Sequence, residues 1–261
     1  MVKLTSRYQQ FVSRLPLPLS DFACQGQTYY GSETRGELAG PPASLRFSFL
    51  FWDIFKDVPD DLFLDIAEGG AYYFLASILL DHLVDGQVED LGMLALLQQS
   101  FWIHGADQFR KSFLPDSPFW VDYNQLLDSH IQGLSNEKFA QDNPDTFTLG
   151  KTIEIAGSKI CPALTSLVGL AHLTNSLPLL PGIEKLLKDF AAGTQFIDDV
   201  QDWRDDLAAG HLTHFLTCTA PSVCWTEYPW PTEEEIEIII NSSMLDLEHW
   251  QLGIDLFTQA I

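Results

Sequence analysis

The chain has 261 residues, 46% of them hydrophobic, which is enough to bury a large core. It carries 36 acidic and 14 basic residues, for a formal net charge of −22. This balance excludes nucleic acid as a partner, because phosphate binding needs clustered cations, and it disfavours docking on an anionic membrane. An acidic protein can still bind an anionic ligand when divalent cations lie between the two.

The cysteines and the apolar segments indicate a cytoplasmic protein. Cys24, Cys161, Cys218 and Cys224 show neither zinc-like spacing nor a disulfide framework. The N-terminal residues lack the apolar core of a signal peptide. The longest uncharged run, 160–183, contains three prolines, so we expect a buried helix followed by a loop and no stable membrane insertion.

In chain order, an irregular lead-in over residues 1–42 is followed by an almost continuous helical pattern. Proline marks the breaks, as at Ser117-Pro118, and Thr232 is a suitable N-cap for the last helix. The expected helices cover residues 43–56, 60–85, 88–114, 118–140, 145–174, 182–210 and 232–258. We predict an all-α single domain over 1–261, a bundle of long helices around an apolar pocket.

The first chemically informative segment is Gly69 to Gly86, GGAYYFLASILLDHLVDG. Asp81 and Asp85 are four residues apart and therefore share one helix face. Tyr73, Phe74 and Ser77 precede them along this stripe. A carboxylate pair at the end of an apolar and aromatic wall differs from an ordinary charged helix face, which predicts a binding site.

The second such segment is 195–210, QFIDDVQDWRDDLAAG. Helical geometry gathers its acids within an arc of roughly 120° and turns Arg204 away from them. Neighbouring like charges on a helix cost about 0.2–0.5 kcal/mol per pair, and bound Mg²⁺ or Mn²⁺ would offset that cost. A solvated acidic face is the alternative interpretation. The acids are Asp198, Asp199, Asp202, Asp205 and Asp206.

Two such helices facing each other would form a negative rim over an apolar tube. We expect Mg²⁺ at this rim to clamp a prenyl diphosphate, with the hydrocarbon tail below it. The aromatic faces of Tyr73 and Phe74 would stabilise an allylic cation.

Three motifs resemble those of the squalene/phytoene synthase family. Asp81-His-Leu-Val-Asp85-Gly86 is similar to D-E-L-V-D-G, and Ile155-Ala156-Gly157 is similar to V-A-G. Asp202-Trp-Arg-Asp-Asp206 with Gly210 has the spacing of the second acidic motif. The resemblance implies an isoprenoid synthase fold with Asp81, Asp85 and Asp202 as catalytic residues. Asp198-Asp199-x-x-Asp202 also looks like the D-D-x-x-D of chain-elongating prenyl synthases.

The chain departs from the family pattern in ways that bear on the reaction. Ile78-Leu79-Leu80 and Gln201 replace the family's basic residues, and Lys151 replaces the tyrosine associated with head-to-head coupling. Only about fifty residues follow the second motif, where the family has several more helices. These departures favour a reaction that consumes one substrate.

Further residues are candidates for binding the diphosphate. Lys151 and Arg46 are cations in otherwise apolar segments, where a surface role is the alternative. We also assign Gln195 to substrate binding. The His211/His214 pair is interpreted as decoration of a helix or turn rather than a metal site.

Three functions remain open on this evidence. The first is a Mg²⁺-dependent class I terpene synthase that converts one prenyl diphosphate to a hydrocarbon or alcohol. The second is a head-to-head or other prenyl transferase, and the third is a non-catalytic isoprenoid-binding relative. Whether the chain forms a homodimer is left open.

Overall fold

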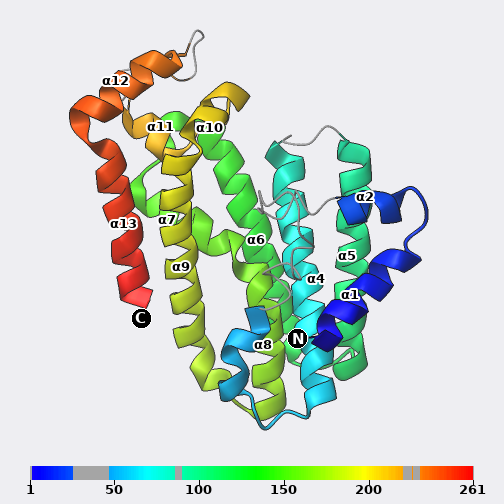
Figure 1. Ribbon diagram of the computed structural model, residues 1–261. Coiled ribbons are helices and arrows are strands. Elements are labelled where there is room, and N and C mark those ends of the chain that lie inside the picture. The colour runs from blue at the N-terminus through cyan, green and yellow to red at the C-terminus, as the bar shows by residue number, and fades with distance from the viewer. Residues whose placement is uncertain (1, 26–46, 86–89, 220–224, 226–229, 261) are drawn as a thin grey trace. The chain divides into compact units, whose positions relative to one another are not determined.

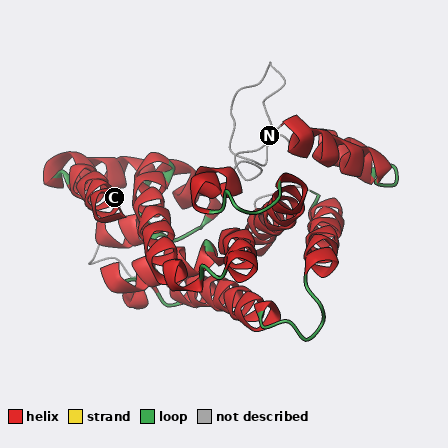
Figure 2. Ribbon diagram, turned by 90° about the horizontal axis from the view of Figure 1, so that it is seen from below, coloured by secondary structure: helices red, strands yellow, loops and turns green. Residues whose placement is uncertain are grey.

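The computed structural model describes residues 2–25, 47–85, 90–219, 225 and 230–260, which form helices joined by short connections (Figure 1). No strand occurs within these ranges, and their ribbons are all helix or loop in Figure 2. The predicted all-α fold is therefore confirmed.

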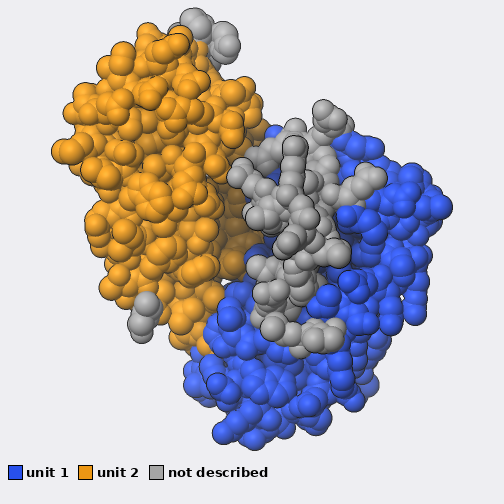
Figure 3. Space-filling model, viewed as in Figure 1, with its two compact units in different colours: residues 1–127, 161–180 blue, residues 128–160, 181–261 orange. Residues whose placement is uncertain are grey.

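The chain divides into two compact units, which are coloured separately in Figure 3. Unit 1 comprises residues 1–127 and 161–180, and unit 2 comprises residues 128–160 and 181–261. Helix α6 (Phe119–Asp142) contributes residues to both. The organisation as one domain over residues 1–261 stays a prediction.

Unit 1 is built around helix α4, most of whose residues are buried. It packs against α5 and α8, and its first turn carries Asp60 and Asp61, which suit the positive end of the helix dipole. The other elements of unit 1 are short or lie around this group. Their bounds, with those of α4, are α1 (Val2–Arg14), α2 (Leu19–Gln25), η2 (Phe47–Ile54), α4 (Asp60–Asp85), α5 (Leu91–Ser112), α8 (Cys161–Thr174) and η4 (Leu177–Leu179).

A partly buried ion pair joins α1 to α4. Arg7 donates to Asp65 at 2.5 Å and to Glu68 at 3.0 Å, and His104 lies 3.2 Å from the other oxygen of Glu68. Burial alone would raise the pKa of Glu68, but the hydrogen bonds to His104 and Arg7 lower it. The carboxylate is therefore ionised and paired inside the unit, which keeps α1 in register on α4.

The N-terminal segment differs from its prediction. Residues 2–14 and 19–25 are helical rather than an irregular lead-in, and they pack apolar side chains such as Leu4 and Val12 into the core of unit 1. The part of the predicted lead-in between residues 26 and 42 lies outside the described residues.

Among the described residues, one helix, α4, is both long enough and apolar enough to cross a membrane. Helices α7 (Leu149–Lys159) and α8, which are separated by a bend, pass the same test when they are counted as one span. In α4, 78% of the relevant window is buried inside the protein, as is typical of core helices. Length and composition are therefore weak evidence for insertion here.

Unit 2 contains the second part of the predicted helical pattern, with additional breaks. The sequence predicted unbroken helices over 145–174, 182–210 and 232–258, but each is interrupted, at Ile160, Asp202 and Met244. The described elements are η3 (Pro144–Thr146), α7 (Leu149–Lys159), α9 (Leu180–Gln201), α10 (Trp203–Ala209), α11 (His214–Thr219), α12 (Glu233–Ser243) and α13 (Leu245–Ala260).

Each break coincides with a proline or with a change of backbone conformation. Pro162 lies in the first turn of α8. Proline is tolerated in a first turn but not in a helix interior, so α7 cannot continue unbroken through this position. Asp202 leaves the α-helical conformation at φ −104° and ψ 6°, and Met244 adopts a left-handed conformation at φ 56°. The N-cap predicted at Thr232 is confirmed, because its side chain accepts from Glu235 N in a capping box.

Helices α9 and α13 run side by side through a contact between two glycines (Figure 1). A Cβ on Gly193 would lie 2.9 Å from the carbonyl oxygen of Gly253, and a Cβ on Gly253 would lie 2.9 Å from that of Gly193. Backbone oxygens cannot move aside as a flexible side chain can. The close approach of the two helices therefore depends on both glycines.

We predict that Gly193→Ala lowers the free energy of unfolding by about 1–3 kcal/mol, because the added methyl group overpacks this contact. Gly182→Ala is the matched control in the same helix, since a Cβ at Gly182 meets no atom within 4 Å. That change should be neutral or stabilise by up to about 1 kcal/mol. Denaturant unfolding of both variants measures this, and equal effects would contradict the glycine contact.

Candidate active site

The first acidic motif lies at the C-terminal end of α4. Asp81 and Asp85 occupy its last two turns and are partly exposed, while the Oδ1 atom of Asp81 is buried. The C-terminal end of a helix carries partial negative charge, so each carboxylate there is disfavoured by about 0.3–1 kcal/mol. A bound cation would offset this unfavourable contribution of the helix dipole to stability.

The aromatic residues that precede these acids on α4 pack against different neighbours. The Tyr73 ring packs against Trp102, at a centroid distance of 4.8 Å, whereas the Phe74 ring lies 6.0 Å from Phe47. The Ser77 hydroxyl donates to the Phe74 carbonyl of its own helix. Adjacent helical residues differ by about 100° in direction, so Tyr73 and Phe74 point to different sides of α4. Of the two, Phe74 is closer in angle to Asp81 and Asp85.

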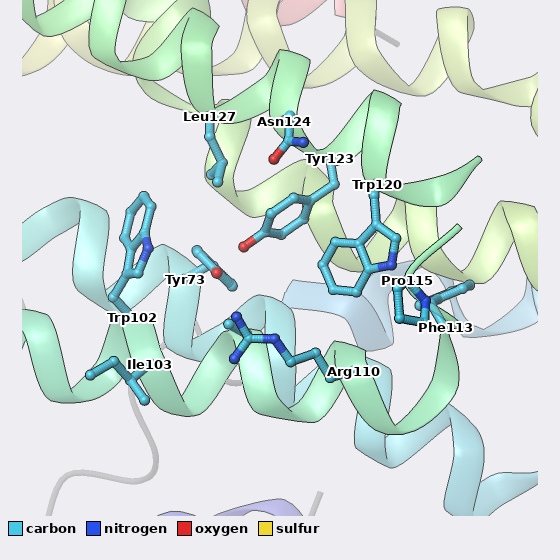
Figure 4. Close-up of a pocket in the computed structure, with 11 residues that line it drawn as sticks. Tyr73, Trp102, Ile103, Arg110, Phe113, Pro115, Trp120, Tyr123, Asn124 and Leu127 are labelled. Carbon is cyan, nitrogen blue, oxygen red and sulfur yellow. The ribbon is translucent and has the colours of Figure 1, made fainter. Parts of the chain in front are cut away.

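Tyr73 lines a cavity of about 650 Å³ within unit 1 (Figure 4). Trp102 from α5 and Trp120 and Tyr123 from α6 form much of its wall, and the guanidinium group of Arg110 points into it. Trp102, Arg110, Trp120 and Tyr123 were not predicted as site residues, because nothing in their spacing distinguishes them from ordinary core or surface positions. Only the packing of α4, α5 and α6 brings their rings together.

The second acidic motif lies where α9 ends and α10 begins. Asp198 is in the last turn of α9, and this last turn contains no basic residue. Asp202 is the N-cap residue of α10. Although Asp198 remains exposed, partial burial of its carboxyl group and the charge of Asp202 raise its pKa. Asp198 therefore lies at the negative end of α9, whereas Asp202 lies at the positive end of α10, and the two carboxylates repel each other.

Asp199 has a different environment from the other acids of this motif. It is 3% exposed and accepts a hydrogen bond from Gln195 Nε2 at 2.7 Å. Burial, together with the charge of Glu137, raises the pKa of Asp199 to about 7, against the opposing effects of Gln195 and Lys159. Near neutral pH the carboxyl group is therefore partly protonated. The acidic face thus has an exposed part and an interior part.

Asp199 belongs to a polar cluster inside unit 2. Glu137 on α6 pairs with Lys159 on α7 through two contacts of 2.8 and 3.1 Å. A cavity of about 20 Å³, large enough for one water molecule, lies between Glu137, Asp199 and Ile155. Ile155 is the first residue of the segment that resembles V-A-G, so that segment lies beside the acidic motif within this unit.

The remaining predicted residues fall in several places. Lys151 pairs with Glu154 one turn further along α7, at 3.0 Å. Asp206 is half-buried in α10, and its carbonyl accepts from the amide of Gly210, whose φ of 74° favours glycine. Arg46 lies outside the described residues.

Arg204 points away from the acidic face, as predicted. It donates to Glu233 at 2.7 Å and to Glu237 at 3.1 Å, and it lies over the ring of Trp203. This cation therefore joins α10 to α12 and does not neutralise the carboxylates of the motif.

The two acidic motifs belong to different units, the first to unit 1 and the second to unit 2. Within unit 2 the structure brings together Asp198 with Asp202, and Asp199 with Gln195. The facing arrangement of the two motifs across an apolar tube stays a prediction.

The buried acid makes a specific prediction for pH. Because the folded-state pKa of Asp199 is raised above its ordinary value of 3.8 to about 7, its contribution to stability is lost as pH rises through this range. Each unit of the shift is worth about 1.4 kcal/mol. In chelator, Asp199→Asn should therefore become more stable relative to wild type as the pH rises from about 4 to about 7.

Denaturant unfolding at several pH values measures this difference. Asp205→Asn, which changes an exposed acid on α10, is the control and should shift stability by less than about 0.5 kcal/mol throughout. A difference between Asp199→Asn and wild type that does not vary with pH would contradict the assigned environment.

Comparison with known proteins supports the fold. No family model matches the chain, and no curated protein matches it by sequence. The structure is similar to the crystal structure of polyprenyl synthetase from Streptomyces coelicolor A3(2), with a TM-score of 0.67 and 14% sequence identity. The similarity covers 99% of this chain and 89% of that one. The chain therefore has the all-α fold of that synthetase.

Proposed function

We propose that this protein is a Mg²⁺-dependent class I terpene synthase that ionises one prenyl diphosphate and releases a hydrocarbon or alcohol. The fold it shares with a polyprenyl synthetase supports the use of a prenyl diphosphate. The acidic motifs support a metal-held diphosphate, and the departures from the squalene/phytoene pattern support a single substrate.

The carboxylates fit Mg²⁺ by chemistry and by position. Mg²⁺ prefers oxygen ligands and usually combines one or two carboxylates with water and phosphate oxygens. Asp198 and Asp202 would hold one such ion at the end of α9, and Asp81 and Asp85 would hold another at the end of α4. Bound there, the metal would supply positive charge to the departing diphosphate.

The observation that carries the proposal is the Asp198–Asp202 pair. The two carboxylates lie four residues apart, and partial burial together with the charge of Asp202 raises the pKa of Asp198. The dipole of α9 further disfavours the charge of Asp198. A solvated acidic face would instead spread its charges or interleave cations, and Arg204 is directed to α12.

The chain's own side chains would position the organic part of the substrate. Phe74 precedes the acids of α4 on nearly the same face, so its ring is placed to attract an allylic cation. Gln195 and Lys151 would contact the diphosphate from α9 and α7. The aromatic cavity at Tyr73 and Trp102 is a second place for a hydrocarbon tail.

Prenyl transfer is the second candidate function. The similarity to a polyprenyl synthetase and the Asp198-Asp199-x-x-Asp202 spacing favour chain elongation. Head-to-head coupling is less favoured, because two diphosphates would need more positive charge than this chain of 14 basic residues provides.

Product analysis distinguishes these reactions. Purified protein is incubated with Mg²⁺ and single prenyl diphosphates of different lengths, with and without isopentenyl diphosphate. We expect products with the same number of carbons as the substrate. Doubled products would establish head-to-head coupling, products longer by isoprene units would establish elongation, and binding without turnover would indicate a non-catalytic relative.

The metal ligands are tested by substitution. Asp81→Asn and Asp202→Asn should each reduce turnover at least about 100-fold, because charge stabilisation of the leaving group is lost, while the helical circular dichroism is unchanged. Asp205→Asn is the matched control on α10 and should retain activity. Full activity in excess chelator would contradict the role of the metal.

A further inference from the structure

A second cluster of metal-binding side chains lies in the interior of unit 2. His214 and Cys218 are one turn apart on α11, and His249 comes from α13. His214 Nδ1 lies 3.1 Å from His249 Nε2, and Cys218 Sγ lies 3.9 Å from His214 Nδ1. Both histidines are buried, the cysteine is half-buried, and their donor atoms lie within 4.8 Å of one another.

His249 is oriented in the way that is typical of a metal ligand. Its Nδ1 lies 3.2 Å from the carbonyl oxygen of Leu245, which only accepts, so this nitrogen carries the hydrogen. The other nitrogen, Nε2, therefore presents its lone pair to His214 and Cys218. Metal-binding histidines commonly donate their second nitrogen to a backbone carbonyl in this manner.

The imidazoles are also held neutral. Burial, together with His249, lowers the pKa of His214 to about 4, and burial lowers that of His249. The rings of Phe196 and Phe215 lie against the pair and keep the surroundings apolar. Each neutral ring keeps one lone pair: His214 Nδ1 donates its hydrogen to His249 Nε2, and the lone pair of His214 is on Nε2, 3.6 Å from Cys218 Sγ.

We propose that His214, Cys218 and His249 bind a zinc-like transition metal ion that fastens α11 to α13. Metal–nitrogen bonds of about 2.0–2.1 Å and a metal–sulfur bond of about 2.3 Å separate tetrahedral ligands by about 3.3 Å between nitrogens and about 3.6 Å between nitrogen and sulfur. The observed 3.1 and 3.9 Å differ from these values by amounts that small side-chain rotations remove.

The chemistry of this cluster differs from that of the acidic motifs. Thiolate and imidazole ligands select Zn²⁺ or Cu⁺, whereas carboxylates suit Mg²⁺. Burial raises the pKa of the Cys218 thiol, so the thiol keeps its proton until the metal arrives. On binding, the thiol would lose its proton to solvent as the metal–sulfur bond forms, and the hydrogen on His214 Nδ1 would move to Nε2 so that Nδ1 can bind the metal.

Cobalt binding tests the proposal. Chelator-treated full-length protein is titrated with Co²⁺ in the presence of excess Mg²⁺, which occupies carboxylate sites. We expect one equivalent to give a thiolate-to-cobalt charge-transfer absorption and strong visible bands of tetrahedral Co²⁺. Zn²⁺ should abolish these bands and raise the unfolding temperature.

Matched variants locate the site. Cys218→Ser should remove the charge-transfer band, and His249→Gln should weaken cobalt binding more than about 10-fold. Cys24→Ser changes an exposed cysteine of α2 and should leave both signals intact. Because Cys218 is only half-buried, its variant provides the test even if His249→Gln fails to fold. Absence of a thiolate band in wild type, or its persistence in Cys218→Ser, would overturn the proposal.

Discussion

The small number of positively charged residues limits the ion pairs that can join one helix to another within each unit. Against 36 acidic residues the chain has 14 basic ones, and several of these join two helices. Arg7 pairs α1 with α4, Lys159 pairs α7 with α6, and Arg204 pairs α10 with α12. These cations are therefore already engaged in ion pairs between helices. Under the proposed function, divalent metal would then supply the charge that a diphosphate needs.

The acidic motifs lie at helix ends, where the backbone dipole affects their charge. Asp81, Asp85 and Asp198 lie at the C-terminal end of a long helix, where the backbone dipole disfavours negative charge, whereas Asp202, Asp205 and Asp206 lie at the start of α10, where the dipole favours it. Ordinary surface helices place acids at their first turn, as α12 does with three glutamates. Under the proposed function, a bound cation would offset the unfavourable dipole at the C-terminal ends of α4 and α9.

Unit 2 combines two kinds of polar interior group. Asp199 shares a buried region with the Glu137–Lys159 pair, where its carboxyl group is easily protonated. The His214–His249 pair is neutral and lies among phenylalanine rings. The first environment suits hard, oxygen-bound ions or a proton, and the second suits a softer metal, so the two sites would bind different ligands from the same helical scaffold.

Much of this architecture follows from the sequence alone. The helical periodicity determines the all-α class, and the long apolar pattern of residues 60–85 predicts α4 with its observed bounds. The spacing of Asp81 with Asp85 and of Asp198 with Asp202 places each pair on one helix face, because i, i+4 contacts are local. The cap at Thr232 is likewise a local property.

Only the tertiary structure decided the rest. The breaks at Asp202 and Met244 and the burial of Asp199 depend on what packs against each helix, which periodicity does not encode. The wall formed by Trp102 and Tyr123 requires α5 and α6 to meet. His249 joins His214 and Cys218 across more than thirty intervening residues, a contact produced by helix packing and invisible in local spacing.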